Sequence, residues 1–215
     1  MAVGPLIAVV DYGSGNLRSV AKALIRSGLE PEITADPAVL RRADGVVLPG
    51  VGAFADAMQH LAAKKLDEAV CAFIASGRPY LGLCLGLQLL FEESDEHGKT
   101  RGLGFFAGRV ERFEEHDAAG ASLRVPHIGW NRVRFFGQHP MLEHLPESDV
   151  FYFVHSYRAV PKTPDCVVGI TEYGGSFAAA VCAPAVFAVQ FHPEKSQLAG
   201  KRFLDAYASW VAACR

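Results

Sequence analysis

The chain has 215 residues, half of them hydrophobic and a fifth charged, with a formal net charge of −2. This size and composition predict a single domain over residues 1–215, with one large core. No lysine or arginine run indicates a nucleic-acid partner or a membrane surface, and no apolar run approaches the ~20 residues of a membrane helix. Five cysteines without C-x-x-C spacing argue against a disulfide framework or zinc site and predict a cytoplasmic protein. We expect no metal and no cofactor.

The first half of the chain alternates between strand-like and helix-like segments. It predicts strands over Leu6–Asp11, Glu30–Thr34 and Ala43–Leu48 and a further strand through Cys84. The predicted helices run from Leu17 to a C-cap at Gly28, from Phe54 to Gly77 as one long helix, and over Leu87–Glu93. This alternation is typical of parallel βαβ units. Ligands of such sheets bind at the carboxyl ends of the strands, which here are Asp11, Pro49 and Cys84.

The second half predicts short strands followed by a closing helix. The strands are Arg109–Phe113, Asn131–Phe136, Val150–Val154, Val167–Tyr173, Phe177–Cys182 and Val186–Phe191, and the helix follows Ser196. The polar stretches Glu92–Arg101 and Glu114–Ser122 are expected to be exposed loops. The fold class is therefore α/β, with a central mixed, mostly parallel sheet, flanking helices and an antiparallel extension.

Cys84 is the leading candidate for a nucleophile. Gly82-Leu83-Cys84-Leu85-Gly86 is a cysteine version of the G-x-S-x-G elbow, which holds a nucleophile on a sharp strand-to-helix turn. A helix N-terminus there favours thiolate, and the N–H of Leu85 can meet a developing oxyanion. The alternative is that Cys84 is a small buried apolar residue, the usual place of a free cysteine.

His192 and Glu194 are the best candidates for a base and its orienting carboxylate. Residues two apart in extended backbone point the same way, and Pro193 fixes the backbone between them. Glu194 can then accept from Nδ1 of His192 and leave Nε2 to exchange a proton with Cys84. A structural histidine–carboxylate pair is the alternative.

The other histidines fit lesser roles. His155 is a second candidate base, although a place in a pocket wall beside the backbone of Ser156 and Tyr157 suits it better. His127 is expected to be structural or at an interface. The remaining five are expected at the surface: His60, His97, His116, His139 and His144.

The glycines of Pro49-Gly50-Val51-Gly52 predict a second wall of an oxyanion hole facing Cys84. Two glycines between a strand and a helix allow close backbone approach and can expose N–H groups to an anion. The segment is not a phosphate loop, since it lacks G-x-x-x-x-G-K-[ST].

Six segments together resemble the class I, or triad, glutamine amidotransferases and, among them, the glutaminase subunits of imidazole glycerol phosphate synthase. They are Asp11–Leu17, Leu48–Phe54, Gly82–Gln88, Pro126–Asn131, Tyr152–Tyr157 and Gln190–Ser196. The resemblance spans nearly the whole chain. The cysteine elbow and the His-Pro-Glu segment indicate only the class, whereas Asp11–Leu17 and Pro126–Asn131 indicate this subunit.

The resemblance implies a flavodoxin-like class I amidotransferase fold and a catalytic triad of Cys84, His192 and Glu194. Glutamine would acylate Cys84 and release ammonia, and water would hydrolyse the thioester. The remaining positions that it implies are an oxyanion hole of Val51 and Leu85 and glutamine-binding residues Gly52, Gln88, Glu96, Ser156 and Tyr157.

The family works in histidine biosynthesis as a heterodimer with a (β/α)₈-barrel cyclase subunit, to which ammonia passes. The candidates for that interface are Asn16, Trp130, Asn131, Lys195 and Ser196. Two departures from the family pattern are Leu87 in place of a common methionine and the long Glu114–Val125 loop. One alternative is another class I glutaminase subunit, such as that of pyridoxal phosphate synthase. The others are a cysteine peptidase or γ-glutamyl hydrolase, and an inactive scaffold.

Overall fold

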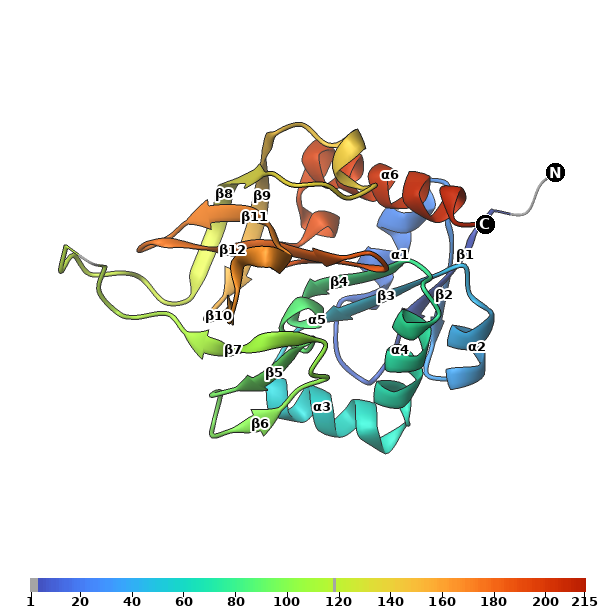
Figure 1. The fold of residues 1–215 in the computed structure, drawn as a ribbon, viewed down its shortest axis with the longest axis horizontal. Helices are drawn as coiled ribbons and strands as arrows, with labels where there is room; N and C mark the ends of the chain where they lie inside the picture. Colours follow the sequence, from blue (N-terminus) through green and yellow to red (C-terminus); the bar gives the residue numbers. More distant parts are fainter. Residues whose placement is uncertain (1–3, 118) are drawn as a thin grey trace.

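A nine-stranded mixed sheet runs through the molecule in the computed structural model, which describes residues 4–117 and 119–215 (Figure 1). Met1–Val3, which precede the expected Leu6–Asp11 strand, and Ala118, in the expected Glu114–Ser122 loop, lie outside the described residues. In spatial order the strands are β2 (Glu30–Thr34), β1 (Leu6–Val10), β3 (Gly45–Gly50), β4 (Tyr80–Cys84), β13 (Val186–Val189), β12 (Ser176–Ala183), β11 (Val167–Glu172), β8 (His127–Phe135) and β9 (Ser148–His155). The first five are parallel, and the last four join antiparallel. The expected mixed sheet with its antiparallel extension is confirmed.

Helices cover both faces of the parallel part. On one side lie α1 (Leu17–Arg26) and α6 (Gln197–Ala213), and on the other α2 (Pro37–Arg42), α3 (Phe54–Ala63) and α4 (Leu66–Ala75). Alternate residues of β1 serve the two cores, since Ile7 and Val9 join the first side and Ala8 and Val10 the second. This is the period of two that a strand buried on both faces requires. In the described part of the chain, no helix is long and apolar enough to cross a membrane.

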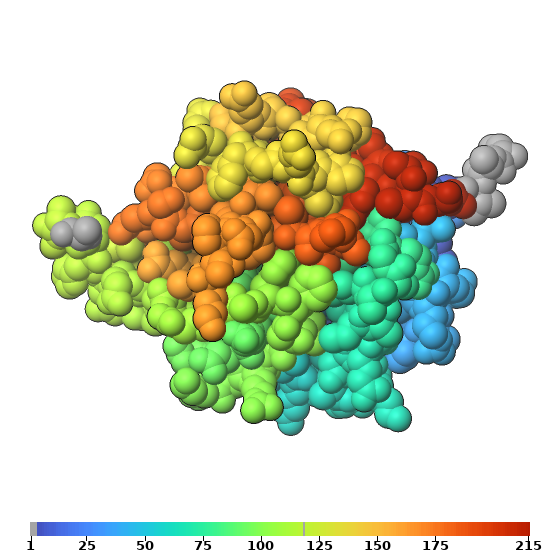
Figure 2. Space-filling model, in the orientation of Figure 1, coloured from blue at the N-terminus to red at the C-terminus, as the bar shows by residue number. Residues whose placement is uncertain are grey.

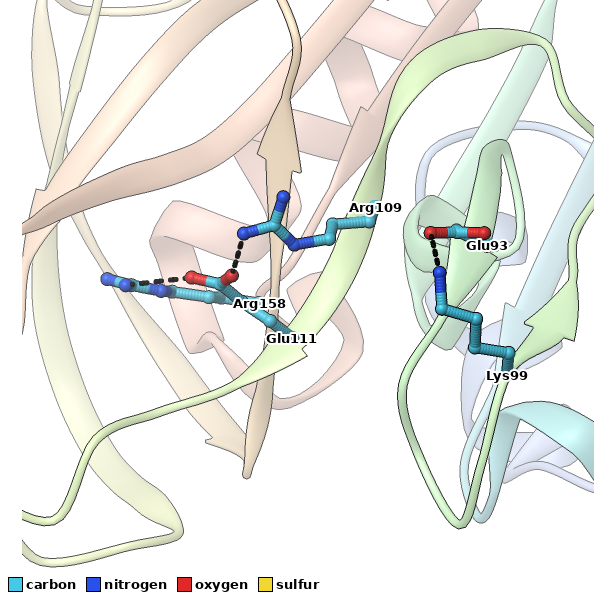
Figure 3. A network of polar contacts seen from close by, with 5 residues as sticks. All are labelled: Glu93, Lys99, Arg109, Glu111 and Arg158. Atoms are coloured by element: carbon cyan, nitrogen blue, oxygen red, sulfur yellow. Dashed lines mark hydrogen bonds and ion pairs between the residues drawn. The ribbon is translucent and has the colours of Figure 1, made fainter.

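A second, four-stranded sheet was not expected. It consists of β10 (Tyr157–Pro161), β7 (Phe106–Arg112), β5 (Phe91–Ser94) and β6 (Thr100–Arg101). The Glu92–Arg101 stretch is therefore not simply a loop. Strands β7 and β10 of this sheet carry ion pairs, with Glu111 between Arg109 at 2.9 Å and Arg158 at 3.1 Å (Figure 3). Such partly exposed pairs add little stability.

Two helix predictions were wrong. The expected helix from Phe54 to Gly77 breaks into α3 and α4 at Lys65, whose φ of 56° is left-handed and ends the regular hydrogen bonding. The helix after Cys84 is only α5 (Leu85–Gln88), and β5 begins at Phe91, within the expected helix. Among the described residues there are also three 3₁₀ turns: η1 (Leu142–His144), η2 (Pro164–Cys166) and η3 (Pro193–Lys195).

The loop between β7 and β8 projects from the body of the molecule, as both the ribbon and the space-filling view show (Figures 1 and 2). Most of its described residues between Glu114 and Ser122 are exposed, which confirms the expected loop. One isolated bridge, His116 with Ser122, joins its two sides.

Candidate active site

Cys84 is held on a strained turn at the end of β4. Its φ of 53° and ψ of −105° lie outside the regions that non-glycine residues favour. The turn leaves no room for a side chain at the glycines two residues before and two residues after Cys84. A Cβ at Gly86 would run into the carbonyl of Leu48, and one at Gly82 would come within 2.7 Å of the carbonyl oxygen of Gly86. The glycines of the elbow are therefore required by the close approach of backbone to backbone.

The parallel pairing of β13 with β4 brings the C-terminal part of the chain to Cys84. Val189 lies opposite Leu83, so both strands end at the same edge of the sheet. The chain then continues through Gln190 to His192, whose N–H donates to the carbonyl of Tyr152 at 2.9 Å. The expected base is thus anchored to β9, beside the end of the strand that carries the expected nucleophile.

His192 and Glu194 form a buried pair. Nδ1 of His192 lies 2.9 Å from Oε1 of Glu194, and the two side chains are only 4% and 3% exposed. Burial by itself lowers the pKa of His192, but Cys84 and Glu194 outweigh it and raise the pKa to about 10. The pair thus favours an imidazolium beside Cys84, with Nδ1 directed to the carboxylate.

Ser196 ties the His192 turn to β9. Its hydroxyl donates to the carbonyl of His192 at 2.7 Å and accepts from the N–H of Tyr152 at 3.0 Å. The side chain is 1% exposed, so it does not reach the surface as the expected interface role would require. The structure instead places Ser196 as a support for the backbone of His192.

A cavity of about 250 Å³ opens in front of Cys84. Every residue expected to bind glutamine or to form the oxyanion hole lines it: Val51, Gly52, Cys84, Leu85, Gln88, Glu96, Ser156 and Tyr157, together with Pro126, Val154 and His155. Its volume is below the roughly 300–1,000 Å³ of sites for drug-sized ligands, which is in the range for a free amino acid. A larger hollow of about 480 Å³ elsewhere is not lined by Cys84.

Two of the cavity residues are also tied into the protein. Gln88 donates through Nε2 to the carbonyl of Tyr157 at 2.9 Å and to Oε1 of Gln190 at 3.0 Å, which leaves its own Oε1 for a ligand. Oε2 of Glu96 accepts from the N–H of Phe54 at 2.7 Å, at the start of α3. Both side chains are therefore held in place before any substrate arrives.

Gln190 is a site residue that the sequence interpretation missed. It is fully buried, and its Nε2 lies 3.5 Å from the sulfur of Cys84. Its position two residues before His192, within the expected Val186–Phe191 strand, was the available signal. An amide donor here can stabilise a thiolate.

The wall formed by Gly50 and Val51 lies close to Leu85. A Cβ at Gly50 would come within 2.8 Å of Cβ of Leu85, so only glycine permits this approach. The hydroxyl of Ser14 donates to the carbonyl of Val51 at 2.6 Å and fixes the following peptide. The two expected sources of oxyanion N–H groups are thus neighbours across the mouth of the cavity.

The remaining histidines divide between core and surface. His155 lines the cavity, and burial lowers its pKa to about 3, while His127 is buried with its pKa lowered to about 4 by burial. His139 was expected at the surface, and that prediction was wrong. It is 6% exposed, because its ring packs against Phe187 and Trp210.

The other interface candidates lie near the surface. Trp130 is 49% exposed, its ring meets Tyr152 edge-on, and Nζ of Lys195 lies 5.8 Å from the centre of the Tyr152 ring. Asn16 is exposed at the start of α1, whereas Asn131 is only partly exposed. Within residues 4–117 and 119–215, no group of three His, Cys, Asp or Glu side chains is arranged to hold a metal.

The family model for glutamine amidotransferase class-I matches residues 8–206. This match defines the class of protein as a class I glutamine amidotransferase. Similar proteins, each named imidazole glycerol phosphate synthase subunit HisH, come from Methylococcus capsulatus, Syntrophotalea carbinolica and Synechococcus elongatus. The Methylococcus protein is 50% identical, covering 95% of this chain and 96% of its own length. The Syntrophotalea protein is 48% identical, covering 94% and 98%, and the Synechococcus protein is 46% identical, covering 100% and 98%. The chain belongs to this amidotransferase family, in its HisH branch.

Solved structures agree on the fold. PurLQS from Thermotoga maritima superposes with a TM-score of 0.73 at 20% identity, covering 99% of this chain and 100% of that one. A putative GMP synthase component from Thermoplasma acidophilum gives 0.71 at 19% identity, covering 99% and 96%. At these identities the likeness concerns the fold alone.

Proposed function

We propose that this chain, as one domain, is the glutaminase subunit of imidazole glycerol phosphate synthase in histidine biosynthesis, with Cys84, His192 and Glu194 as its catalytic triad. The observation that carries the proposal is Cys84, on a strained strand end in the wall of an amino-acid-sized cavity, beside the buried His192–Glu194 pair. Gly52, Gln88, Glu96, Ser156 and Tyr157 would bind glutamine there.

The first half of the reaction acylates Cys84. The thiolate attacks the side-chain carbonyl carbon of glutamine, and the N–H groups of Val51 and Leu85 stabilise the oxyanion. The C–N bond then breaks, His192 gives its proton to the leaving nitrogen, and ammonia departs. The product is a γ-glutamyl thioester, with His192 now neutral and still oriented by Glu194.

The second half returns the enzyme to its starting state. His192 takes a proton from water, whose oxygen attacks the thioester carbon, and the C–S bond breaks to release glutamate and the thiolate. The new carboxyl group releases its proton to solvent, so the sum is glutamine and water to glutamate, ammonia and a proton. This cycle uses no metal and no cofactor.

Ammonia would pass to the partner, a (β/α)₈-barrel cyclase subunit, which makes imidazole glycerol phosphate and aminoimidazole carboxamide ribonucleotide. Asn16, Trp130, Asn131 and Lys195 are the residues that we propose for this heterodimer interface. Five free cysteines, among them the exposed Cys71 and Cys214, support a reducing, cytoplasmic location.

Glutamate release from glutamine tests the proposal, measured for the chain alone and in complex with the cyclase partner and its nucleotide ligand. We expect slow release alone, faster release in the liganded complex, and none above background for Cys84→Ala. Full activity without a partner would indicate another class I glutaminase. Cys71→Ala, at an exposed cysteine, is the matched control. An inactive wild type would indicate a scaffold, and activity that survives Cys84→Ala would exclude the triad.

A further inference from the structure

Two buried histidines that the reaction does not use face each other across β8 and β9. His127 pairs directly with His155 in the antiparallel register, and Nδ1 of His127 lies 3.1 Å from Nε2 of His155. The His127 ring is stacked between Tyr173 and Phe153, with centroid distances of 3.9 and 4.8 Å. The pair is therefore held rigidly.

The hydrogen-bond partners of His127 and His155 determine which ring nitrogen of each histidine carries the proton. Nδ1 of His155 lies 2.8 Å from the carbonyl of Tyr157, which can only accept, so Nδ1 carries the proton. If His155 is neutral, its Nε2 must accept, and Nδ1 of His127 must donate. Nε2 of His127 then accepts from Nδ2 of Asn131 at 3.4 Å.

The orientation of Asn131 agrees with this assignment. Its Nδ2 also donates to the carbonyl of Glu172 at 2.8 Å, and its Oδ1 accepts from the N–H of Arg132. An amide turned the other way would lose both contacts. The direction of every hydrogen bond from Asn131 to Tyr157 is therefore set by backbone groups at the two ends.

Electrostatics keeps both rings neutral. Burial is the main reason that the pKa values of His127 and His155 fall to about 4 and 3, and the charge of His192 lowers that of His155 further. A proton on His155 would place a second cation near the imidazolium of His192. A neutral ring can serve the site without this repulsion.

The chain of hydrogen bonds continues to the nucleophile. The Tyr157 carbonyl that accepts from His155 also accepts from Gln88, which donates to Gln190, and Gln190 donates to the sulfur of Cys84. Hydrogen bonds thus join the partly exposed Asn131 to Cys84 without a break.

We propose that His127 and His155 are positioning residues of the glutamine site, a neutral imidazole pair that fixes the Tyr157 carbonyl and, through it, Gln88 and Gln190. The inference rests on the proposed function, because turnover of glutamine is what this arrangement would serve. Neither ring takes part in proton transfer to the substrate.

Two substitutions of His127 separate positioning from mere packing. His127→Phe keeps the ring between Tyr173 and Phe153 but loses the donor, whereas His127→Asn loses the stacking but retains an N–H near the place of Nδ1. Positioning predicts that the KM for glutamine rises about five-fold in His127→Phe, the equivalent of one neutral hydrogen bond, with a smaller change in kcat. His127→Asn should be less stable than His127→Phe and yet have a KM closer to wild type.

The measurements use the full chain with its cyclase partner and nucleotide ligand, and Arg132→Ala, at an exposed side chain on the same strand, is the control. An unchanged KM in His127→Phe, or a higher KM in His127→Asn than in His127→Phe, would overturn the proposal. A wild type without glutaminase activity would instead contradict the proposed function.

A spectrum of the wild type tests the arrangement without any substitution. In ¹⁵N-labelled full-length protein, two-bond ¹H–¹⁵N correlations distinguish the Nδ1–H, Nε2–H and doubly protonated forms of each ring. We expect His127 and His155 to be neutral and protonated at Nδ1 between pH 6 and 8. An Nε2–H or imidazolium form of either ring would refute the proposal, whatever the activity.

Discussion

The Nε2 atom of Gln190 lies 3.5 Å from the sulfur of Cys84, while Oε1 of the same side chain accepts from Gln88 at 3.0 Å. Because Gln190 directly follows the strand next to Cys84, its amide joins the nucleophile to the wall of the substrate cavity. This fully buried contact leads to the first prediction.

Replacing Gln190 with Met should slow alkylation of Cys84 by iodoacetamide about ten-fold at pH 7, because a donor to a charged sulfur is worth roughly 1.5–3 kcal/mol. Mass spectrometry of the peptide that contains Cys84 measures the rate, apart from the other cysteines. Gln138→Met, at an exposed glutamine, is the control. Unchanged alkylation would show that the amide does not stabilise the thiolate.

Replacing Glu194 with Gln should lower kcat for glutamine about 10³-fold, since a neutral partner neither holds the charge nor fixes the tautomer of His192. The carboxylate contributes to raising the pKa of His192 to about 10. The variant should therefore lose the imidazolium at a lower pH than wild type, which an NMR titration of His192 can follow. Glu93→Gln, in a surface pair with Lys99, should change neither quantity. An unaltered His192 titration would contradict the role assigned to Glu194.

Replacing Gly86 with Ala should destabilise the chain by about 3 kcal/mol or more, although alanine favours helices, because the new Cβ meets the carbonyl of Leu48. Gly77→Ala is the matched control. Gly77 has a φ of 79° but no neighbour within 4 Å of a built Cβ, so it should cost only about 1 kcal/mol. Urea unfolding measures both, and equal losses would rule out the backbone clash as the reason for glycine in the elbow.

His139 should make the fold sensitive to acid. Burial lowers its pKa from 6.5 to about 4, so between these values the unfolded chain binds a proton that the folded chain does not. Stability that is present above pH 6.5 is therefore lost as the pH falls towards 4, at up to about 1.4 kcal/mol per pH unit.

His139→Phe should accordingly lose about 2 kcal/mol less stability than wild type between pH 7 and pH 4.5. Its stability at pH 7 is expected to fall, because the N–H of Met141 loses its acceptor, Nδ1 of His139. The slope against pH, measured by urea unfolding, is the diagnostic quantity. The exposed His144→Phe should leave this slope unchanged, and a parallel shift of the His139→Phe curve would contradict the prediction.

Features that depend on residues close together in the chain could be predicted from the sequence, whereas features that depend on distant contacts could not. Apolar runs and alternating apolar residues were sufficient to predict the strands of the nine-stranded sheet, and β8, β9, β11, β12 and β13 all overlap their expected segments. By contrast, β5 and β6 are short and lie in a charged stretch, where β5 pairs with β7 on one side and with β6 on the other. The break at Lys65 has no glycine or proline to mark it.

The amino-acid sequence alone determined the local features of the site, because each depends on neighbours in the chain. These are the glycines that permit the Cys84 turn, the spacing that places Glu194 beside His192, and the glycines of the Val51 wall. It also sufficed to indicate the family.

Only the tertiary structure decided how these pieces meet. The register of β13 against β4 brings together Gln190 and Cys84, which are 106 residues apart. No local pattern encodes that pairing, because the two strands are far apart in the chain and become neighbours only when the whole sheet has formed. The same long-range packing buries His139, pairs His127 with His155, and buries Ser196, an interface candidate, where it supports the backbone of His192.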